Sequence, residues 1–155
     1  MRGKQIMTVT GPVNANLLGT VYSHEHLIVQ PQIPDEKYIA YTLSDENASA
    51  KEVQLFANAG GKTIVEMTPI NYGRDVLAYQ RIAEKTGIYV ICCTGFHKEL
   101  FMPSWFKEKK SSQIYDEVLN EIENGIDKTS IRPGVIKMGT SFENITDQER
   151  REQWG

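Results

Sequence analysis

The residues best suited to chemistry lie in the segment Ser23-His24-Glu25-His26. In a β-strand, residues two apart point to the same side, roughly 6.5–7 Å from each other along the chain. His24 and His26 could therefore converge on one metal ion at nitrogen–metal distances of roughly 2.0–2.1 Å, while Glu25 would face the other side. The same spacing also fits two half-buried histidines at a strand end that bind nothing. The pair is thus a candidate metal site that depends on what else lies beside it.

A second candidate is Lys137, which lies inside the short apolar segment Val135-Ile136-Lys137-Met138. Burying an ammonium ion is costly unless a partner compensates the charge. One interpretation is a strand-end lysine whose ammonium reaches solvent or pairs with Glu66. The other is a neutral amine that carbon dioxide converts to a carbamate, whose two oxygens can bridge two metal ions. The residues alone leave both interpretations open.

The segments that must position these residues alternate between strand-like and helix-like patterns. Short apolar, β-branched runs predict buried strands, and apolar residues at helical spacing predict amphipathic helices. The predicted strands are residues 17–23, 63–67, 88–93 and 134–138, and the predicted helices are residues 50–58, 75–86 and 113–124. Ser49 is the predicted N-cap of the first helix, and Thr146-Asp147 is expected to open one more helix.

Alternating strands and helices are typical of parallel βαβ units, because each crossover helix covers one face of the sheet. The predicted fold class is therefore α/β. Two architectures fit this order: a doubly wound open sheet and part of a (β/α)8 barrel. No glycine-rich phosphate loop follows a predicted strand, since Gly60-Gly61 precedes one, so a nucleotide-binding fold is disfavoured.

Composition narrows the class of protein further. The 155 residues carry a formal net charge of -3 and a pI near 5.6, which argues against a nucleic-acid partner or an anionic membrane surface. Polar residues interrupt every apolar run, so no membrane-spanning helix is expected, and the N-terminus lacks the apolar core of a signal peptide. Cys92 and Cys93 lie in an apolar run, which predicts buried strand residues rather than a disulfide framework. We expect a cytoplasmic enzyme.

A series of ordered segments extends these local patterns along essentially the whole chain. They are Thr8-Val9-Thr10-Gly11-Pro12, Leu18-Gly19, His24-Glu25-His26-Leu27, Gly60-Gly61-Lys62-Thr63-Ile64-Val65-Glu66, Gly73-Arg74-Asp75, Thr86-Gly87-Ile88, Thr94-Gly95-Phe96, Glu121-Ile122, Gly125-Ile126-Asp127 and Val135-Ile136-Lys137. In this order and spacing they resemble the phosphotriesterase family of the amidohydrolase superfamily. The resemblance implies a (β/α)8 barrel with its site at the carboxyl ends of the strands. It also implies that His24 and His26 bind the more buried metal, and that Lys137 is a carbamylated lysine bridging two divalent ions. Zinc is the first expectation for these ions, with manganese and cobalt as alternatives.

The same resemblance implies residues that this sequence does not contain. Family members carry two further metal-binding histidines on strands five and six and a catalytic aspartate after strand eight, whereas this sequence ends at Gly155. We therefore expect residues 1–155 to form a single partial domain, the N-terminal half of a (β/α)8 barrel with about four βα units. No catalytic residue is then expected within the chain itself. A second copy or a complementing C-terminal half would complete the site.

The activity that the resemblance implies is metal-dependent hydrolysis, in which a metal-bound hydroxide attacks a small-molecule ester, lactone or phosphoester. A phosphorylated sugar lactone is one expected substrate, and the loop that begins with Phe96, His97 and Lys98 is expected to contact it. Glu66 stands where the family often has an acidic residue, with either a structural or a catalytic role. Because the ligand set is incomplete, little or no turnover is expected of the chain alone. The alternatives are a non-catalytic half-barrel that binds at most one metal weakly and an open-sheet binding domain with incidental histidines.

Overall fold

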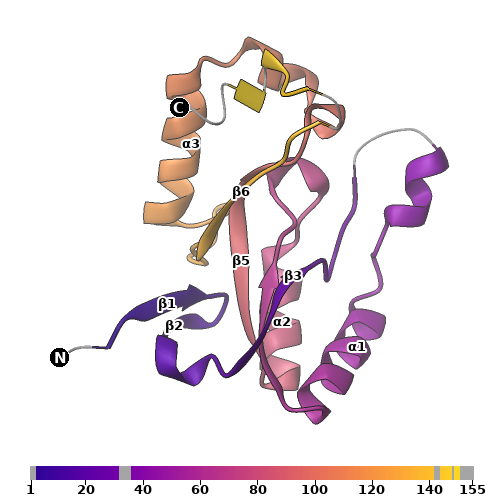
Figure 1. Cartoon of the computed structure of the whole chain (residues 1–155), viewed down its shortest axis with the longest axis vertical. Coiled ribbons are helices and arrows are strands. Elements are labelled where there is room, and N and C mark those ends of the chain that lie inside the picture. Colours follow the sequence, from indigo (N-terminus) through magenta and orange to yellow (C-terminus); the bar gives the residue numbers. More distant parts are fainter. Residues whose placement is uncertain (1–2, 32–35, 142–143, 148, 151–155) are drawn as a thin grey trace.

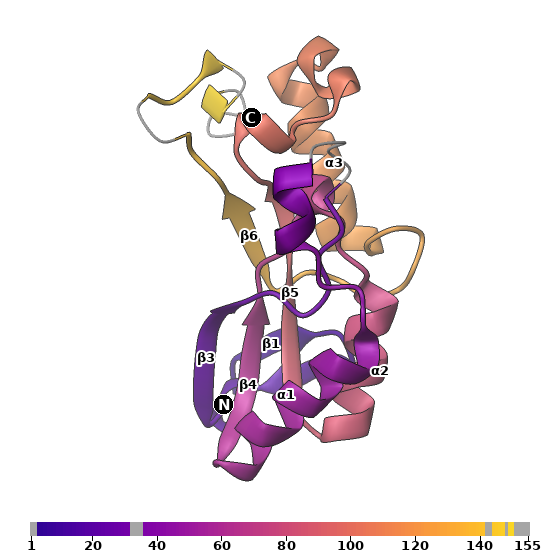
Figure 2. The same ribbon diagram turned by 90° about the vertical axis from the view of Figure 1, so that its right-hand side faces the viewer.

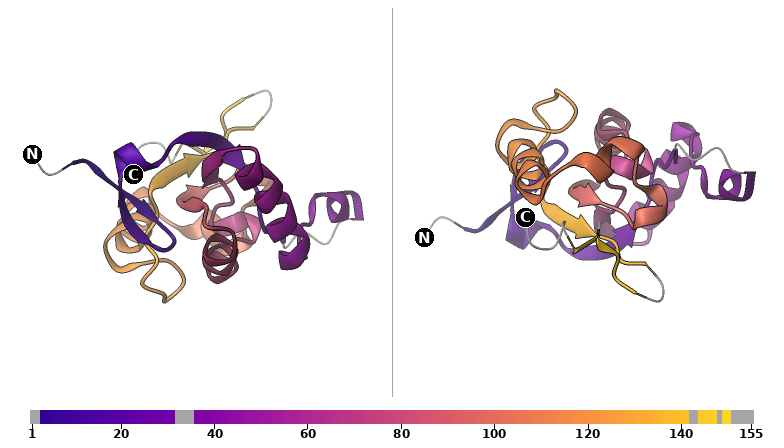
Figure 3. Two further views of the ribbon diagram at one scale, coloured as in Figure 1. Left: turned by 90° about the horizontal axis from the view of Figure 1, so that it is seen from below. Right: turned by 90° about the horizontal axis from the view of Figure 1, so that it is seen from above.

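The structure is a computed structural model of the chain, and it describes residues 3–31, 36–141, 144–147 and 149–150. Its centre is a parallel sheet whose strands are hydrogen-bonded in sequence order: β3 (Thr20–Glu25), β4 (Gly61–Glu66), β5 (Tyr89–Phe96) and β6 (Val135–Met138). The strands fan across the molecule (Figure 1), and end-on views show a curled sheet with helices outside it (Figure 3). A doubly wound sheet reverses its strand order at a switch point, whereas a (β/α)8 barrel keeps it. The prediction of an α/β half-barrel with about four strands is confirmed.

Helices cover the convex face of this sheet in the described part of the chain (Figure 2). They are α1 (Glu46–Asn58), α2 (Val76–Thr86) and α3 (Ser111–Asn124). The carboxylate of Asp75 caps α2 by accepting the Ala78 N–H at 2.9 Å, and Gly87 ends the helix in the left-handed region at φ 71°. Helices α2 and α3 therefore lie where the helical periodicity predicts them.

The start of α1 differs from the prediction. The N-cap is Asp45, not Ser49, because the Asp45 carboxylate accepts the N–H groups of Asn47 at 2.9 Å and Ala48 at 3.0 Å. Ser49 lies inside the helix, and its hydroxyl donates to the carbonyl of Leu27 at 2.6 Å. The serine thus ties α1 to the segment that follows β3.

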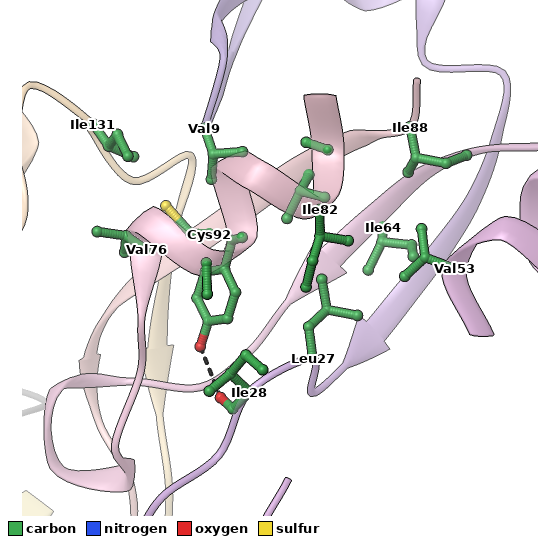
Figure 4. Close-up of a cluster of buried hydrophobic side chains, with 14 of the residues drawn as sticks. Val9, Leu27, Ile28, Val53, Ile64, Val76, Ile82, Ile88, Cys92 and Ile131 are labelled. Atoms are coloured by element: carbon green, nitrogen blue, oxygen red, sulfur yellow. Dashed lines mark hydrogen bonds between the residues drawn. The ribbon is translucent and has the colours of Figure 1, made fainter. Parts of the chain in front are cut away.

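The main hydrophobic core fills the space between α2 and the sheet (Figure 4). Tyr79 and Ile82 of α2 and Val90 of β5 have no exposed surface, and Ile64 of β4 packs in the same cluster. Fully burying one such side chain contributes about 1.5–3 kcal/mol. The one polar atom of Tyr79 is satisfied, because its hydroxyl donates to the carbonyl of Ile28 at 2.9 Å, drawn as the dashed line in Figure 4. The core therefore fixes the chain just beyond the end of β3.

A buried ion pair joins the helices to β5. The guanidinium of Arg74 contacts the carboxylate of Glu121 in α3, with Nη1 donating to Oε2 at 3.0 Å, and also contacts Asp127 at 3.1 Å. Thr94 of β5 donates its hydroxyl to the same Glu121 oxygen at 2.5 Å. The side chain of Arg74 is only 3% exposed. The segment before α2, helix α3 and the central strand are therefore connected by charge-assisted hydrogen bonds.

Sequence periodicity did not predict the N-terminal hairpin. Strands β1 (Gln5–Thr8) and β2 (Gly11–Asn14) pair antiparallel, and Val9 between them donates its N–H to the carbonyl of Val90 at 2.8 Å. The hairpin therefore packs at the N-terminal end of β5. The first parallel strand also begins later than predicted, since Leu17 ends a 3-10 turn and β3 starts at Thr20.

Several smaller expectations can also be compared with the structure. Cys92 and Cys93 are buried and free, as predicted. Helical hydrogen bonding follows Thr146, whose carbonyl accepts the Arg150 N–H at 2.9 Å; residues 151–155 lie outside the described part. Among helices of the described residues, none combines the length and the apolar character needed to cross a membrane.

Candidate metal centre

A β-bulge near the end of β3 determines where the two histidines point. The pairing of β3 with β4 contains one extra β3 residue between Tyr22 and Glu25. Tyr22 faces the helices, with its ring centroid 5.7 Å from that of Phe56 in α1. An extra residue reverses the alternation of side chains along a strand, so His24 leaves the face that Tyr22 occupies. The rings of His24 and His26 then lie together, 5.3 Å apart at their centroids.

Lys137 reaches His24 across the concave side of the sheet. Its Nζ lies 3.5 Å from Nε2 of His24, although β3 and β6 are the two edge strands. Lys137 is 7% exposed, so its amine does not extend into solvent. Among the ion pairs of the described residues, none joins Lys137 to Glu66. The structure therefore disfavours a lysine that reaches solvent and a lysine that pairs with Glu66. It places Lys137 beside the histidines.

A glycine allows β6 to come this close. Gly95 of β5 pairs with Lys137 and has a φ of +96°, a conformation that residues with a side chain rarely adopt. A Cβ at this position would overlap the backbone carbonyl oxygen of Lys137. Lys137 can therefore occupy its position only because residue 95 of the neighbouring strand is a glycine.

Burial and the lysine charge both disfavour protonation of the histidines. The pKa of His26 is lowered to about 4, first by burial and then by the charges of Lys137 and His24. The same two causes, burial and Lys137, lower the pKa of His24. Burial also lowers the pKa of Lys137 itself. Neutral imidazole is the form that binds metal ions, and the lowered pKa values favour this form of both histidines at neutral pH.

Thr68 and Glu66 lie behind His26. Sequence patterns did not indicate Thr68, and they leave the role of Glu66 open between structural and catalytic. The Nδ1 atom of His26 is 2.8 Å from the hydroxyl of Thr68, which in turn donates to Glu66 at 2.5 Å. Glu66 is fully buried and accepts the backbone N–H of Leu27 at 3.1 Å, which is the structural role considered for it. Burial raises the pKa of Glu66 to about 7 although these hydrogen bonds oppose the shift. A threonine two residues beyond a strand-end glutamate is the signal that could have identified Thr68.

His97 lies in an aromatic cluster next to the pair. Its ring centroid is 4.8 Å from those of Tyr72 and Phe101, and Tyr72 is 5.7 Å from His26. Asn71 fixes the backbone of His97 by accepting its N–H at 2.6 Å and donating to its carbonyl at 3.1 Å. Burial is the main cause that lowers the pKa of His97 to about 4. The structure thus brings the third histidine to the same end of the sheet, and local periodicity gave no indication of Asn71 or Tyr72.

The other two residues expected to contact substrate lie differently. Phe96 is the last residue of β5 rather than part of the following loop, and it is 1% exposed. Its ring packs against Phe106 and Ile114 on the helix-covered side. Lys98 does lie in the loop, with its Nζ 5.8 Å from the ring centroid of Phe101. Phe96 therefore faces the helix-covered side of the sheet, whereas His97 lies in the aromatic cluster next to His26.

The residues present fit a metal ion as part of a ligand set. No group of three or more His, Cys, Asp or Glu side chains suited to a metal occurs within the described ranges. Catalytic zinc sites use three protein ligands and one open position. His24 and His26 offer two imidazoles, and Lys137 would add oxygen ligands only after carboxylation. The described residues therefore supply a partial set.

Comparison with known proteins identifies the family. The Phosphotriesterase family model matches residues 4–152. The chain belongs to the phosphotriesterase family. The resemblance drawn from the ordered sequence segments is confirmed, and the curled sheet is the corresponding half of the (β/α)8 barrel of these proteins.

Individual relatives show which part of a family member the chain corresponds to. It is 33% identical over 159 residues to the phospho-furanose lactonase of Mycoplasmopsis agalactiae, covering 93% of this chain and 45% of that protein. It is 30% identical over 177 residues to the N-acetyltaurine hydrolase of Homo sapiens, covering 95% and 50%. The crystal structure of a lactonase from Listeria monocytogenes superimposes with a TM-score of 0.89 at 31% identity, covering 96% of this chain and 51% of that one. The chain spans about half the length of the curated relatives it matches.

Proposed function

We propose that this chain carries the first half of the ligand set of a two-metal hydrolase, formed by His24, His26 and Lys137. The observation that supports the proposal most directly is the 3.5 Å separation between Lys137 Nζ and His24 Nε2, which joins opposite edges of a curled sheet. Membership of a hydrolase family and the lactonases among its relatives agree with it. A desolvated amine beside two neutral imidazoles is otherwise an unfavourable arrangement, because its charge is uncompensated.

Each residue has a separate role in this proposal. His24 and His26 would hold a divalent ion, zinc foremost or else manganese or cobalt, through neutral ring nitrogens. The amine nitrogen of Lys137 would add to the carbon of CO2 and lose a proton, and the resulting carbamate oxygens would hold both ions. The lowered pKa of Lys137 favours the neutral amine that this addition needs. When bound, the two ions supply Lewis acidity and a water-derived nucleophile at neutral pH.

We propose that the half of the barrel that this chain does not span supplies the further metal ligands. The same half would supply the group that takes up the proton lost by the attacking water. Two apolar grooves flank the open edges of the sheet. One, of about 680 Å³, lies between β3 and α1 and includes Tyr22 and Phe56; the other, of about 280 Å³, lies between α3 and β6 and includes Ile136 and Met138. A complementing C-terminal half would cover both grooves and pair with both edge strands. A second copy of the chain is the other candidate occupant, and the chain alone is proposed to bind at most one ion weakly.

The proposed substrate is a small lactone or related ester, including phosphorylated sugar lactones, with His97 at its binding surface. The phospho-furanose lactonase name of the 33% identical relative supports this choice. The human relative is named for hydrolysis of an N-acyl compound, so an amide is the second substrate class to test. A cytoplasmic location stays a prediction from composition.

The proposal is tested by metal content and turnover measured together. The chain is loaded with zinc in bicarbonate buffer, alone or with the separately produced C-terminal half of the Mycoplasmopsis agalactiae relative. A sugar-phosphate lactone, a simple lactone, an N-acyl amide and a phosphotriester are assayed. Lys137→Met and His26→Asn are compared with Lys62→Met, a control lysine that is exposed on β4.

We expect at most one weakly held ion and little turnover for the chain alone, and two ions with lactone hydrolysis for the complemented pair. Lys137→Met and His26→Asn should each lower the metal content and reduce turnover by at least a hundredfold, while Lys62→Met should change neither. Metal content that is insensitive to both site variants would refute the ligand assignment. Full turnover by the chain alone would refute the half-set proposal.

A further inference from the structure

The hydroxyl of Thr68 lies between a buried carboxylate and one of the candidate ligands. It is 2.5 Å from Oε1 of Glu66 and 2.8 Å from Nδ1 of His26, and neither Thr68 nor Glu66 is exposed. We propose that Glu66, acting through Thr68, holds neutral His26 in the tautomer with its proton on Nδ1, which leaves Nε2 free to bind a divalent ion. Both residues are positioning residues, because they act through the imidazole and not on the substrate.

The direction of the hydrogen bonds follows from counting protons. Glu66 accepts the Leu27 N–H at Oε1 and the Thr68 N–H, 3.0 Å away, at Oε2. Backbone N–H groups can only donate, and an ionised carboxylate can only accept. While Glu66 is ionised, the single hydroxyl proton of Thr68 therefore goes to Glu66, and only lone pairs of the hydroxyl remain for His26. The imidazole must then donate from Nδ1.

The same carboxylate also fixes the backbone beside the ring. Leu27, whose N–H it accepts, directly follows His26, and Ile28 is held in turn by the Tyr79 hydroxyl at 2.9 Å. Glu66 therefore orients both the backbone next to His26 and, through Thr68, the imidazole ring of His26. A metal-binding histidine whose second nitrogen is held in this way gains both the correct tautomer and the correct ring orientation.

Ionisation of Glu66 sets the conditions of the test. Its pKa is raised to about 7, because burial outweighs the hydrogen bonds from Thr68, Leu27 and Tyr79. At pH 8.5 the carboxylate form predominates, so measurements are made there. Removal of metal with a chelator isolates the hydrogen-bond effect from coordination.

The inference rests on the proposed function for the claim that His26 binds metal, but the tautomer itself can be observed without metal. Nitrogen-15 NMR of the ring nitrogens, in metal-free chain with labelled histidine, distinguishes a protonated Nδ1 from a protonated Nε2. Thr68→Val removes the hydroxyl with little change of shape, and Thr68→Ser restores it. Thr63→Val is the matched control, because Thr63 is an equally buried β4 residue whose hydroxyl donates to Leu18 at 2.7 Å.

We expect the Nδ1–H tautomer of His26 in the parent chain, in Thr68→Ser and in Thr63→Val, and a loss of this preference in Thr68→Val. Zinc affinity should fall by about 10–100-fold in Thr68→Val and recover in Thr68→Ser. An Nε2–H tautomer in the parent chain would overturn the inference, as would an unchanged tautomer in Thr68→Val. If Thr68→Val does not fold, Thr68→Ala, which also removes the hydroxyl, takes its place in the comparison.

The two proposals fail in different ways. If His26→Asn leaves zinc binding unchanged while Thr68→Val alters the tautomer, the metal role of His26 is wrong and the hydrogen-bond relay stands. If zinc binding requires His26 but the tautomer does not respond to Thr68→Val, the relay alone is wrong.

Discussion

Replacing Lys137 by methionine should make the metal-free chain more stable. Lys137 is 7% exposed, and the polar group nearest to its amine among its hydrogen-bond partners is an imidazole nitrogen of His24 at 3.5 Å rather than a carboxylate. Burial lowers the pKa of Lys137, which means that the folded state disfavours the ammonium form that the unfolded chain carries at neutral pH. Folding at pH 7 therefore includes either a desolvated charge or the release of a proton, and both oppose it. Methionine fills similar space without this cost.

The size of the effect follows from the cost of burying an uncompensated polar group, about 1–3 kcal/mol in proteins. For a chain of this length that is a rise in melting temperature of roughly 2–12 °C, at about 2–4 °C for each kcal/mol. The size of the effect depends on pH in a defined way. Because the folded-state pKa of Lys137 is lowered, the penalty is absent above the unfolded pKa of about 10.4, grows as pH falls below that value, and is complete below the folded-state pKa. The advantage of methionine should therefore shrink as pH approaches 10.

The assay is urea unfolding of the chelator-treated chain in CO2-free buffer at pH 7 and pH 10. Lys62→Met is the control, because Lys62 is exposed on β4 and its replacement should change the free energy of unfolding by no more than about 0.5 kcal/mol. A loss of stability in Lys137→Met at pH 7, or a change no larger than that of Lys62→Met, would refute the idea that the amine is held desolvated among the histidines.

Three further substitutions test other parts of the structure by the free energy of unfolding. Gly95→Ala should lower the free energy of unfolding by about 2–6 kcal/mol, because backbone strain and overlap with the next strand each contribute about 1–3 kcal/mol. Gly87→Ala is the control, since Gly87 also has a positive φ but has open space around it, and this substitution should cost only the strain. Equal losses of stability in the two variants would contradict the overlap. His97→Phe should stabilise the chain by about 1–3 kcal/mol at pH 8, since the buried Nδ1 has no partner among the described residues. This gain should grow as pH falls from 8 to 5, because unfolded histidine binds a proton below about 6.5 and the folded one only near 4; a pH-independent gain would contradict the lowered pKa. Arg74→Met should cost about 3–5 kcal/mol by leaving buried Glu121 unpaired, and a loss below about 1 kcal/mol would show that the pair is solvated.

The order of the main elements could be predicted because it depends on local patterns. The apolar run 88–93 and the helical spacing in 75–86 each reflect burial of one segment against the sheet. The hairpin at 5–14 could not be predicted in this way, since each strand has four residues and one contains Pro12. Its stability comes from packing on β5, which is distant in sequence. The N-cap at Asp45 was not predicted because Asp45 and Ser49, four positions apart, are both good capping residues. Only the backbone geometry decides between them.

The sequence allowed candidate site residues to be selected, but it did not predict the geometry in which they lie. The spacing of His24 and His26 indicated a shared face, yet it gave no sign of the bulge that separates that face from Tyr22. The approach of Lys137 to His24 spans 113 positions, so only the family resemblance connected them in advance. Thr68 has no metal-binding chemistry of its own, and its importance arises only from the atoms on either side of it. The apolar run 88–93 predicts that Phe96 lies in the following loop, whereas pairing with β6 extends the strand to Phe96.

The central claim is that His24, His26 and Lys137 share one metal-binding position. Its most direct test is a crystal structure of the chain with zinc and bicarbonate, with data collected on both sides of the zinc absorption edge. We predict an anomalous peak roughly 2.0–2.1 Å from Nε2 of both histidines, with density for a carboxylated amine at Lys137 facing the same ion. A peak bound elsewhere, with the two histidines unliganded and Lys137 turned away from them, would contradict it.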